Sequence, residues 1–459
     1  EGSIRELWTI SFPLMVSTFA MLLMIFTDRI FLAHYSIEAM NASVTAGTLA
    51  WAFSSGIGMI TSMSEVFVAQ YNGAKLYRKI GSPVWQMVWV SLFSFALCIP
   101  IAVWGGSLFF SGNPYSEVEI VYFRWLMLFA PSYALMTAFV GFFIGRGKTK
   151  LMIWLPIIAN ALNIILDRIL IFGVEGWIPE MGIQGAAIAT CFGYFFETVI
   201  LIYLFLRKKN RETYGTGNWR FEPQEMVKCL KIGVPQGIYC FLEVFGWAGF
   251  YWMMTALSPA HITISSICQS FTILLSFFCE GLCRGSAALA GNFIGSKRHF
   301  LVSKVLRSGI VLLFLFMLGT SAFLVFDPVD TAGLLFFTHF EGGEISAAID
   351  PGLTESLKIC MLLAFAYIFF DGVRWVLSRL LIAAGDTFFL LVTGSISVWV
   401  FLLLPVYFIV VQNQLSVEYA WGLTVLYSLI FFVFYLLRFN KGAWKKIELI
   451  TPEKEGEHP

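Results

Sequence analysis

Four carboxylates lie deep inside segments of the chain that are otherwise apolar enough to cross a membrane: Asp28, Asp167, Glu243 and Asp371. An ionised side chain at the centre of a bilayer costs from about 3 to more than 10 kcal/mol, so such residues face a cavity or a partner and usually carry function. A carboxylate in this setting can take up a proton or bind a cation. We therefore expect the chemistry of the chain to reside at these positions.

One of the four acids belongs to a polar stripe. Asn160, Asn163 and Asp167 have the spacing i, i+3, i+7, which places them on one helix face together with Pro156. Proline withdraws a backbone donor and frees a carbonyl, as is typical where backbone lines a wet cavity. The stripe offers oxygen ligands for a proton or a hard cation such as Na⁺. The alternative is polar contact between helices, which suits asparagine better than an ionised aspartate.

Two of the acids are followed directly by arginine. Arg29 follows Asp28 and Arg168 follows Asp167. Consecutive residues point about 100° apart around a helix, so neither arginine can face its neighbouring acid. Either arginine could still neutralise an acid on another helix.

A third arginine is better placed. Tyr367, Asp371 and Arg374 are spaced i−4, i, i+3 and share one helix face. This geometry allows an ion pair whose balance changes when the acid takes a proton; the alternative is a static salt bridge. Glu280 and Arg284 are spaced i, i+4, and we expect them to pair with each other.

Catalytic signatures are missing from the sequence. It contains no HExxH, no Ser/His pair within one apolar segment, and no GxxxxGK[ST] loop that would bind ATP. The eight cysteines are scattered, mostly in apolar runs, and are expected to be small core residues rather than ligands or disulfides. We expect no enzyme activity and no cofactor apart from a coupling ion.

The composition indicates an all-α polytopic membrane protein. Of 459 residues, 58% are hydrophobic and only 13% are charged, too few to cover the surface of a soluble protein of this length. Apolar runs long enough to cross the bilayer are predicted near 8–33, 45–70, 84–110, 121–145, 151–173, 184–206, 230–256, 263–292, 305–326, 355–382, 387–411 and 417–438.

Basic residues predict the orientation. Most of the 30 lysines and arginines fall on alternate connections, including the 207–231 segment and the C-terminal tail, whereas the opposite connections hold at most Arg124 and Lys358. The positive-inside rule then places both termini in the cytoplasm. The 327–352 connection is acidic and is expected outside. We expect a multi-pass protein of a bacterial inner membrane, in contact with lipid and not with nucleic acid.

The two halves of the chain resemble each other. Pro235 follows Pro13 by the same number of residues as Gly295 follows Gly73, and we call this number the first repeat offset. The two glycines lie in the basic turns after the second and eighth apolar runs. Later matches have a larger, second repeat offset, as from Gly147 to Gly385, because of the long acidic connection. Six runs per half predict parallel repeats related by an axis along the membrane normal, with substrate between them. The predicted organisation is an N-terminal lobe 1–206, a linker 207–229, a C-terminal lobe 230–438 and a tail 439–459.

These motifs resemble the multidrug and toxic compound extrusion (MATE) family of the MOP superfamily. The similarity covers essentially the whole chain and rests on Phe26-Thr27-Asp28, Asn163 to Asp167, Gly185 to Thr190, Glu243, and Tyr367 to Asp371. It implies two pseudo-symmetric six-helix lobes. It also implies that the equivalents of Asp28, Asn163, Asp167 and Thr190 take H⁺ or Na⁺.

The resemblance extends to the NorM branch of the family. Members of that branch carry an acidic pair matching Glu243 and Asp371, with a tyrosine at the Tyr367 position, and this chain has both sets. We expect a monomeric antiporter that exports small amphipathic organic compounds, cationic by analogy, in exchange for H⁺ or Na⁺ by alternating access. The alternatives are a lipid-linked oligosaccharide flippase of the same superfamily, suggested by the embedded arginines, and a non-transporting receptor or scaffold with statically paired acids.

Overall fold

The computed structural model describes residues 1–113, 115–325 and 351–450. In this part of the chain twelve helical segments are long and apolar enough to cross a membrane, which confirms the all-α polytopic prediction. The acidic 327–350 stretch and the end of the tail from 451 lie outside the described residues.

The first half of the chain forms six crossings. Several are built from more than one helical piece. Their bounds are α1 (Ile4–Tyr35), α2 (Ile37–Thr61) with α3 (Ser64–Gly73), η1 (Tyr77–Lys79) with α4 (Gly81–Phe93), α5 (Phe95–Pro100), the π-helical η2 (Ile101–Gly105) and α6 (Gly106–Phe110), α7 (Ser116–Gly145), α8 (Leu151–Phe172), and α9 (Ile183–Phe205).

The second half repeats this plan after a short linker helix, α10 (Lys208–Tyr214). Its helices are α11 (Pro223–Leu257), α12 (Pro259–Gly295), α13 (Phe300–Val325), α16 (Pro351–Ala383), α17 (Thr387–Ser397) continued by the π-helical η3 (Val398–Leu403) and η4 (Val406–Val411), and α18 (Val417–Lys441), followed by η5 (Ala443–Lys446). The seventh crossing begins at Pro223, earlier than the predicted 230. Pro223 occupies the start of α11, where its missing N–H costs no helical hydrogen bond, so the helix extends beyond its apolar part.

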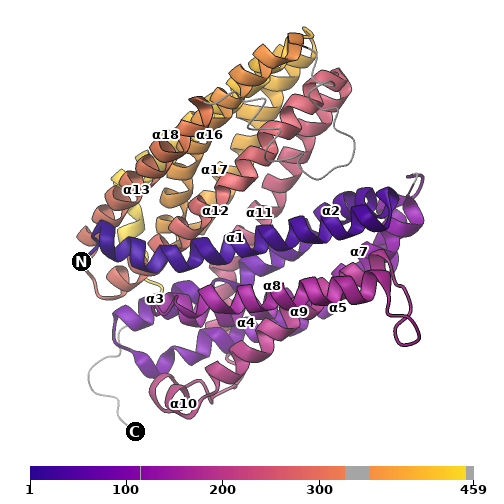
Figure 1. The fold of residues 1–459 in the computed structure, drawn as a ribbon. Helices are drawn as coiled ribbons and strands as arrows, with labels where there is room; N and C mark the ends of the chain where they lie inside the picture. The colour runs from indigo at the N-terminus through magenta and orange to yellow at the C-terminus, as the bar shows by residue number, and fades with distance from the viewer. Residues whose placement is uncertain (114, 326–350, 451–459) are drawn as a thin grey trace.

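The helices form two groups, which we call the N-lobe (Ile4–Phe205) and the C-lobe (Pro223–Lys441). In the N-lobe α1 packs on α8, α2 on α7, and α9 on both α7 and α8; in the C-lobe α12 and α18 pack on α16, and α11 on α17. The lobes meet through α1 with α12, α2 with α11, and α3 with α12. In Figure 1 the indigo-to-magenta N-lobe and the pink-to-yellow C-lobe lie close at the end that carries the N-terminus and diverge toward the other end.

The repeat offsets of the sequence reappear in the backbone. Lys75 and Lys297, which are related by the first repeat offset, both adopt left-handed conformations, with φ of 61° and 59°. Such values are uncommon for residues other than glycine. Gly147 and Gly385, which are related by the second repeat offset, also match, with φ of 69° and 88°. Equivalent turns therefore follow equivalent helices in the two halves.

The two lobes touch backbone to backbone next to these turns. A Cβ on Gly73 of α3 would collide with the carbonyl oxygen of Asn292 in α12, and a Cβ on Gly295 of α12 would collide with the carbonyl oxygen of Gln70 in α3. The two contacts exchange under the first repeat offset. Glycine is needed at both positions because any side chain would force the helices apart.

Candidate functional site

The predicted N-lobe residues converge between three helices. Asp28 of α1, Asn163 and Asp167 of α8, and Thr190 of α9 are all buried, with at most 8% of each exposed. Thr190 Oγ1 donates to Asp28 Oδ2 at 3.0 Å. In the amide orientation that satisfies its neighbours, Asn163 donates to Asp28 Oδ1 at 2.9 Å and to Asp167 Oδ2 at 3.2 Å. One asparagine therefore bridges two buried carboxyl groups.

Part of this site lacks a partner. Asp167 Oδ1 is buried and accepts no hydrogen bond from the described residues. Asn160 lies two turns before Asp167 on the same face of α8 and donates to the Ala20 carbonyl of α1 at 3.1 Å, while its own side-chain oxygen is buried without a donor in the described chain. Both oxygens are free to accept from a proton carrier or to bind a cation.

The arginines next to these acids point away from them. Arg29 and Arg168 are both exposed, and the Arg168 guanidinium lies 5.0 Å from the ring of Phe172. Within the described ranges, no lysine, arginine or histidine forms an ion pair with Asp28 or Asp167. The N-lobe pair therefore has carboxylates without a fixed counter-charge.

The predicted C-lobe residues gather around a single arginine. Arg374 of α16 is 2% exposed. Its Nε donates to Asp371 Oδ1 at 2.6 Å, its Nη2 to Glu243 Oε1 at 3.1 Å, and its Nη1 to the Tyr239 hydroxyl oxygen at 2.7 Å. The guanidinium also lies 4.8 Å from the ring of Phe431 in α18. The two acids thus share one built-in cation.

Tyr367 lies one turn before Asp371 and points to a different neighbour. It is buried, and its ring meets Trp247 of α11 edge to face at a centroid distance of 5.6 Å. Across the same interior, the hydroxyl group of Tyr427 in α18 is buried without a hydrogen-bond partner in the described chain. The C-lobe interior is therefore polar beyond its ion pairs.

Two further embedded arginines are paired, but not as predicted. The expected pair of Glu280 with Arg284 is wrong: Glu280 accepts from Arg379 Nη2 at 3.0 Å, and Arg284 Nη2 lies 3.6 Å from Glu65 Oε2 in α3. The local spacing brings Glu280 and Arg284 near each other, but partners on other helices compete for both. The Arg284–Glu65 pair also crosses between the lobes.

Sequence reasoning missed the role of Tyr239 and left Glu197 unassigned. Tyr239 precedes Glu243 by one turn of α11, so its position on the same face was readable from spacing. Glu197 follows Thr190 by two turns on α9; it is half-buried and has no hydrogen bond or ion pair in the described chain. Its position on the Thr190 face was equally readable.

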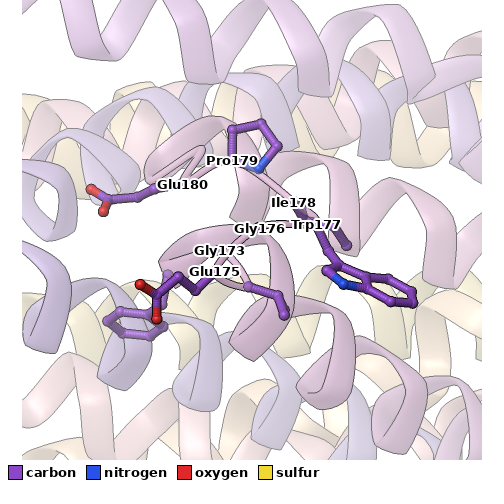
Figure 2. Close-up of a pocket in the computed structure, with 9 residues that line it drawn as sticks. Gly173, Glu175, Gly176, Trp177, Ile178, Pro179 and Glu180 are labelled. Atoms are coloured by element: carbon purple, nitrogen blue, oxygen red, sulfur yellow. The ribbon is translucent and has the colours of Figure 1, made fainter.

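The hairpin between α8 and α9 forms a surface hollow lined by residues 172–180 (Figure 2). In Figure 2 the carboxylates of Glu175 and Glu180 lie on one side of the hollow and Trp177, 90% exposed, on the other. The hollow contains none of the predicted site residues. Its hairpin instead closes the end of the helix pair that carries Asp167 and Thr190.

The arrangement suits ion exchange rather than catalysis. Within the described residues no three His, Cys, Asp or Glu side chains gather as a metal site. With the Asn163 amide turned so that its oxygen rather than its nitrogen faces the acids, the N-lobe would offer Na⁺ six oxygens: two each from Asp28 and Asp167, and one each from Asn163 and Thr190. A proton bound to one carboxyl would serve equally to relieve the repulsion within the pair.

Twelve helices that are long and apolar enough to cross a membrane, arranged in two repeated halves with buried carboxyl groups in each, are typical of a membrane transporter. The MatE family matches residues 13–169 and 235–408, which together make up most of the chain. The chain therefore belongs to the MatE family.

Known proteins resemble it along nearly its whole length. The probable multidrug resistance protein NorM of Thermotoga maritima is 26% identical over 462 residues, covering 98% of this chain and 95% of the relative. The eukaryotic MATE transporter AtDTX14 shares the fold with a TM-score of 0.81 at 18% identity, over 97% of this chain and 98% of that one. A MOP superfamily transporter from Pyrococcus furiosus, whose binding pocket is described as having reverse polarity, has a TM-score of 0.79 at 20% identity, over 96% and 97%.

Proposed function

We propose that the protein is a secondary antiporter that exports amphipathic organic cations in exchange for H⁺ or Na⁺. The observation that carries this proposal is the buried N-lobe pair, Asp28 and Asp167, bridged by Asn163 and lacking a basic partner in the described chain. Two neighbouring ionised carboxylates repel each other, so such a pair binds a cation or holds a proton. The naming of relatives as multidrug resistance proteins supports a drug-like substrate.

The proposed cycle uses competition for these carboxylates. Binding of the coupling ion neutralises the pair and weakens its attraction for a cationic substrate. The ion must bind more tightly in one orientation of the lobes than in the other, because only a differential affinity can shift the equilibrium between them. Release of the ion on the opposite side then restores the negative charge and the starting orientation.

A row of aromatic side chains in the N-lobe supports a cationic substrate. The rings of Trp51 in α2 and Tyr133 in α7 are 5.4 Å apart, and those of Tyr133 and Tyr194 in α9 are 5.3 Å apart. Glu197 lies one turn after Tyr194 and has no partner in the described chain. Aromatic faces and a free carboxylate attract an organic ammonium by cation–π and charge interactions. We assign this row, with Glu197, to substrate binding.

We place the end that carries Ile4 and α10 in the cytoplasm of a bacterial cell, following the distribution of basic residues. The lobes diverge toward the other end in Figure 1, which in our proposal is the end that faces the outside. The proposed functional unit is a monomer, since each lobe brings its own acids and the two lobes together complete the transport path.

The flippase alternative finds no support in the arginines that suggested it. Arg374 is paired with Asp371 and Glu243, and Arg29 and Arg168 are exposed and point away from the buried acids, so none of the three offers an unpaired charge in the interior to a phosphate group. The scaffold alternative fits the static pairing in the C-lobe but not the N-lobe pair. Antiport is therefore the function that we propose.

The test is transport by purified protein in liposomes. A fluorescent organic cation such as ethidium would be loaded, and its movement followed under an imposed H⁺ or Na⁺ gradient. We expect movement to need one of the two gradients and to cease in Asp28→Asn and Asp167→Asn. Glu119→Gln is the matched control, because Glu119 is also buried in the N-lobe but accepts hydrogen bonds from Thr45 and Asn113. Full gradient-driven transport in both aspartate variants would make the N-lobe site structural.

A further inference from the structure

Two amide side chains cross the boundary between the lobes in opposite directions. Gln70 of α3 is 1% exposed, and its Nε2 donates to the Ala383 carbonyl of α16 at 2.7 Å. Asn292 of α12 donates through Nδ2 to the Gly145 carbonyl of α7 at 2.8 Å. Each bond runs from the second crossing of one lobe to the end of the fourth crossing of the other.

The two bonds are equivalent under the internal repeat. The donors Gln70 and Asn292 are related by the first repeat offset, and the acceptors Gly145 and Ala383 by the second. Donor and acceptor therefore both map onto their counterparts in the other half of the chain. The bonds are one interaction that occurs twice, once in each direction across the boundary.

The acceptors are carbonyls that the helices leave without an internal donor. After α7 and α16 the chain turns through Gly147 and Gly385, and the amides of that turn bond back to the carbonyls just before Gly145 and Ala383. The last carbonyls of a helix have no intrahelical partner and need one from elsewhere. Here the donor comes from the opposite lobe.

A third bond lies beside this pair. Asn72 of α3 donates through Nδ2 to Asn292 Oδ1 at 2.6 Å, so Asn292 accepts across the boundary as well as donating across it. The backbone contacts of Gly73 and Gly295 hold α3 and α12 together at the same level. The amides therefore sit where the lobes are closest.

We propose that Gln70 and Asn292 form a double latch that holds the lobes together at this end of the molecule, and that both bonds must break when this end opens. This inference rests on the proposed alternation of the lobes, and it names the residues that resist the opening of this end. Separation would strip the donors from two buried carbonyls at once, which is more costly than losing exposed hydrogen bonds. The latch biases the transporter toward the conformation described here.

The test removes the donors and keeps their size. In Gln70→Glu and Asn292→Asp the ionised side chain can no longer donate to the carbonyl, while the acceptor that Asn72 uses remains; labelling is compared at pH 7 and pH 9.5, because a buried carboxyl keeps its proton to a higher pH and only its ionised form lacks the donor. Gln86→Glu is the matched control: Gln86 is 0% exposed, and its amide donates to the Arg220 carbonyl at 3.1 Å within the N-lobe and linker. The chemical change is the same, but no bond between the lobes is lost.

Separation of the lobes is measured by the labelling of a thiol placed between them. Ser11 of α1 is 0% exposed and its hydroxyl faces Gly285 of α12, so Ser11→Cys puts a small thiol between the lobes. A membrane-impermeant maleimide is applied from the side of the N-terminus, with no gradient and no substrate. Labelling of the native cysteines is measured in the protein that lacks Ser11→Cys and is subtracted.

Each latch variant is expected to raise the labelling rate about tenfold, and the double variant about a hundredfold, with Gln86→Glu unchanged. The two single variants should give similar rises because the bonds are equivalent. Labelling in both Gln70→Glu and Asn292→Asp at the rate of the control would overturn the latch. Since labelling needs no gradient, faster labelling together with absent antiport would reject the proposed function and leave the latch standing.

Discussion

Each lobe contains a pair of neighbouring carboxyl groups in its interior, and the two pairs are neutralised in opposite ways. In the C-lobe, Asp371 and Glu243 bind the guanidinium of Arg374, a cation that is part of the chain. In the N-lobe, Asp28 and Asp167 have a bridging amide and a hydroxyl donor but no basic partner in the described residues. A site that already contains its cation has little need of another, whereas one that lacks it must take a cation from solution. In the antiport that we propose, this difference makes the N-lobe pair the coupling site and the C-lobe pair a structural support whose charges are already balanced.

The largest expected effect is the loss of coupling in the N-lobe. Asp28→Asn and Asp167→Asn should each lower gradient-driven export by about a hundredfold or more, because one neutral side chain removes the repulsion that makes the pair bind an ion. Thermal unfolding should change little, since an asparagine keeps the shape and relieves a buried charge. A variant that exports normally, measured beside Glu119→Gln, would remove the N-lobe from the coupling mechanism.

Removal of the built-in cation should damage the C-lobe differently. Arg374→Met leaves the buried Asp371 and the partly buried Glu243 without a counter-charge, and loss of one partner from a buried ion pair costs about 3–5 kcal/mol. The expected result is a large fall in the unfolding temperature in detergent. Adding Asp371→Asn and Glu243→Gln to Arg374→Met should recover much of the loss, and failure to do so would mean that Arg374 stabilises the lobe through packing rather than charge.

The two C-lobe acids should differ from each other in both stability and transport. Asp371 lies closer to Arg374 and is less exposed than Glu243, with 9% against 23% of the side chain accessible. Asp371→Asn is therefore expected to cost more, by about 1–2 kcal/mol, and to impair export more than Glu243→Gln. Efflux and unfolding would be measured for both variants and for Asp371→Asn combined with Arg374→Ala. Full recovery of export in that combination would confine Asp371 to a structural salt bridge.

The smallest expected effect concerns the substrate alone. Glu197→Gln should lower the apparent affinity for an organic cation by about tenfold, the scale of one partly screened charge interaction of about 1.4 kcal/mol. A neutral substrate of similar shape should be unaffected, and so should the choice of coupling ion. Equal losses for the charged and the neutral compound would show that Glu197 supports the fold and does not recognise charge.

Much of the architecture was readable from the sequence because membrane helices are long and their periodicity is simple. The spacing of Asn160, Asn163 and Asp167 placed them on one face, and the repeat offsets located turns that the backbone reproduces at Lys75 and Lys297. What could not be read was how faces of different helices meet. That α11 and α16 converge on Arg374 depends on packing between distant segments.

The wrong pairing of Glu280 and Arg284 has the same origin. An i, i+4 pair contributes only about 0.2–0.5 kcal/mol on a helix, so partners supplied by other helices easily displace it. Here Arg379 and Glu65 do so. The latch residues could not be predicted either, because Gln70 and Asn292 bind backbone carbonyls, and the sequence does not show which backbone carbonyls need a partner.

The backbone contacts at Gly73 and Gly295 define a point about which α3 and α12 can turn relative to each other. In the alternation of the lobes that we propose, helices that touch without intervening side chains would rotate about the point of contact with little sliding while this end stays closed, so the crossing would act as a fulcrum near one end of the molecule. At 1.5 Å per residue, the helices extend roughly 40–50 Å beyond it. A rotation of about 10° at the fulcrum therefore moves their far ends by about 7–9 Å, which is comparable to the width of a flat aromatic molecule. A small rearrangement around two glycines is thus geometrically sufficient to admit or exclude a drug-sized compound at the opposite face.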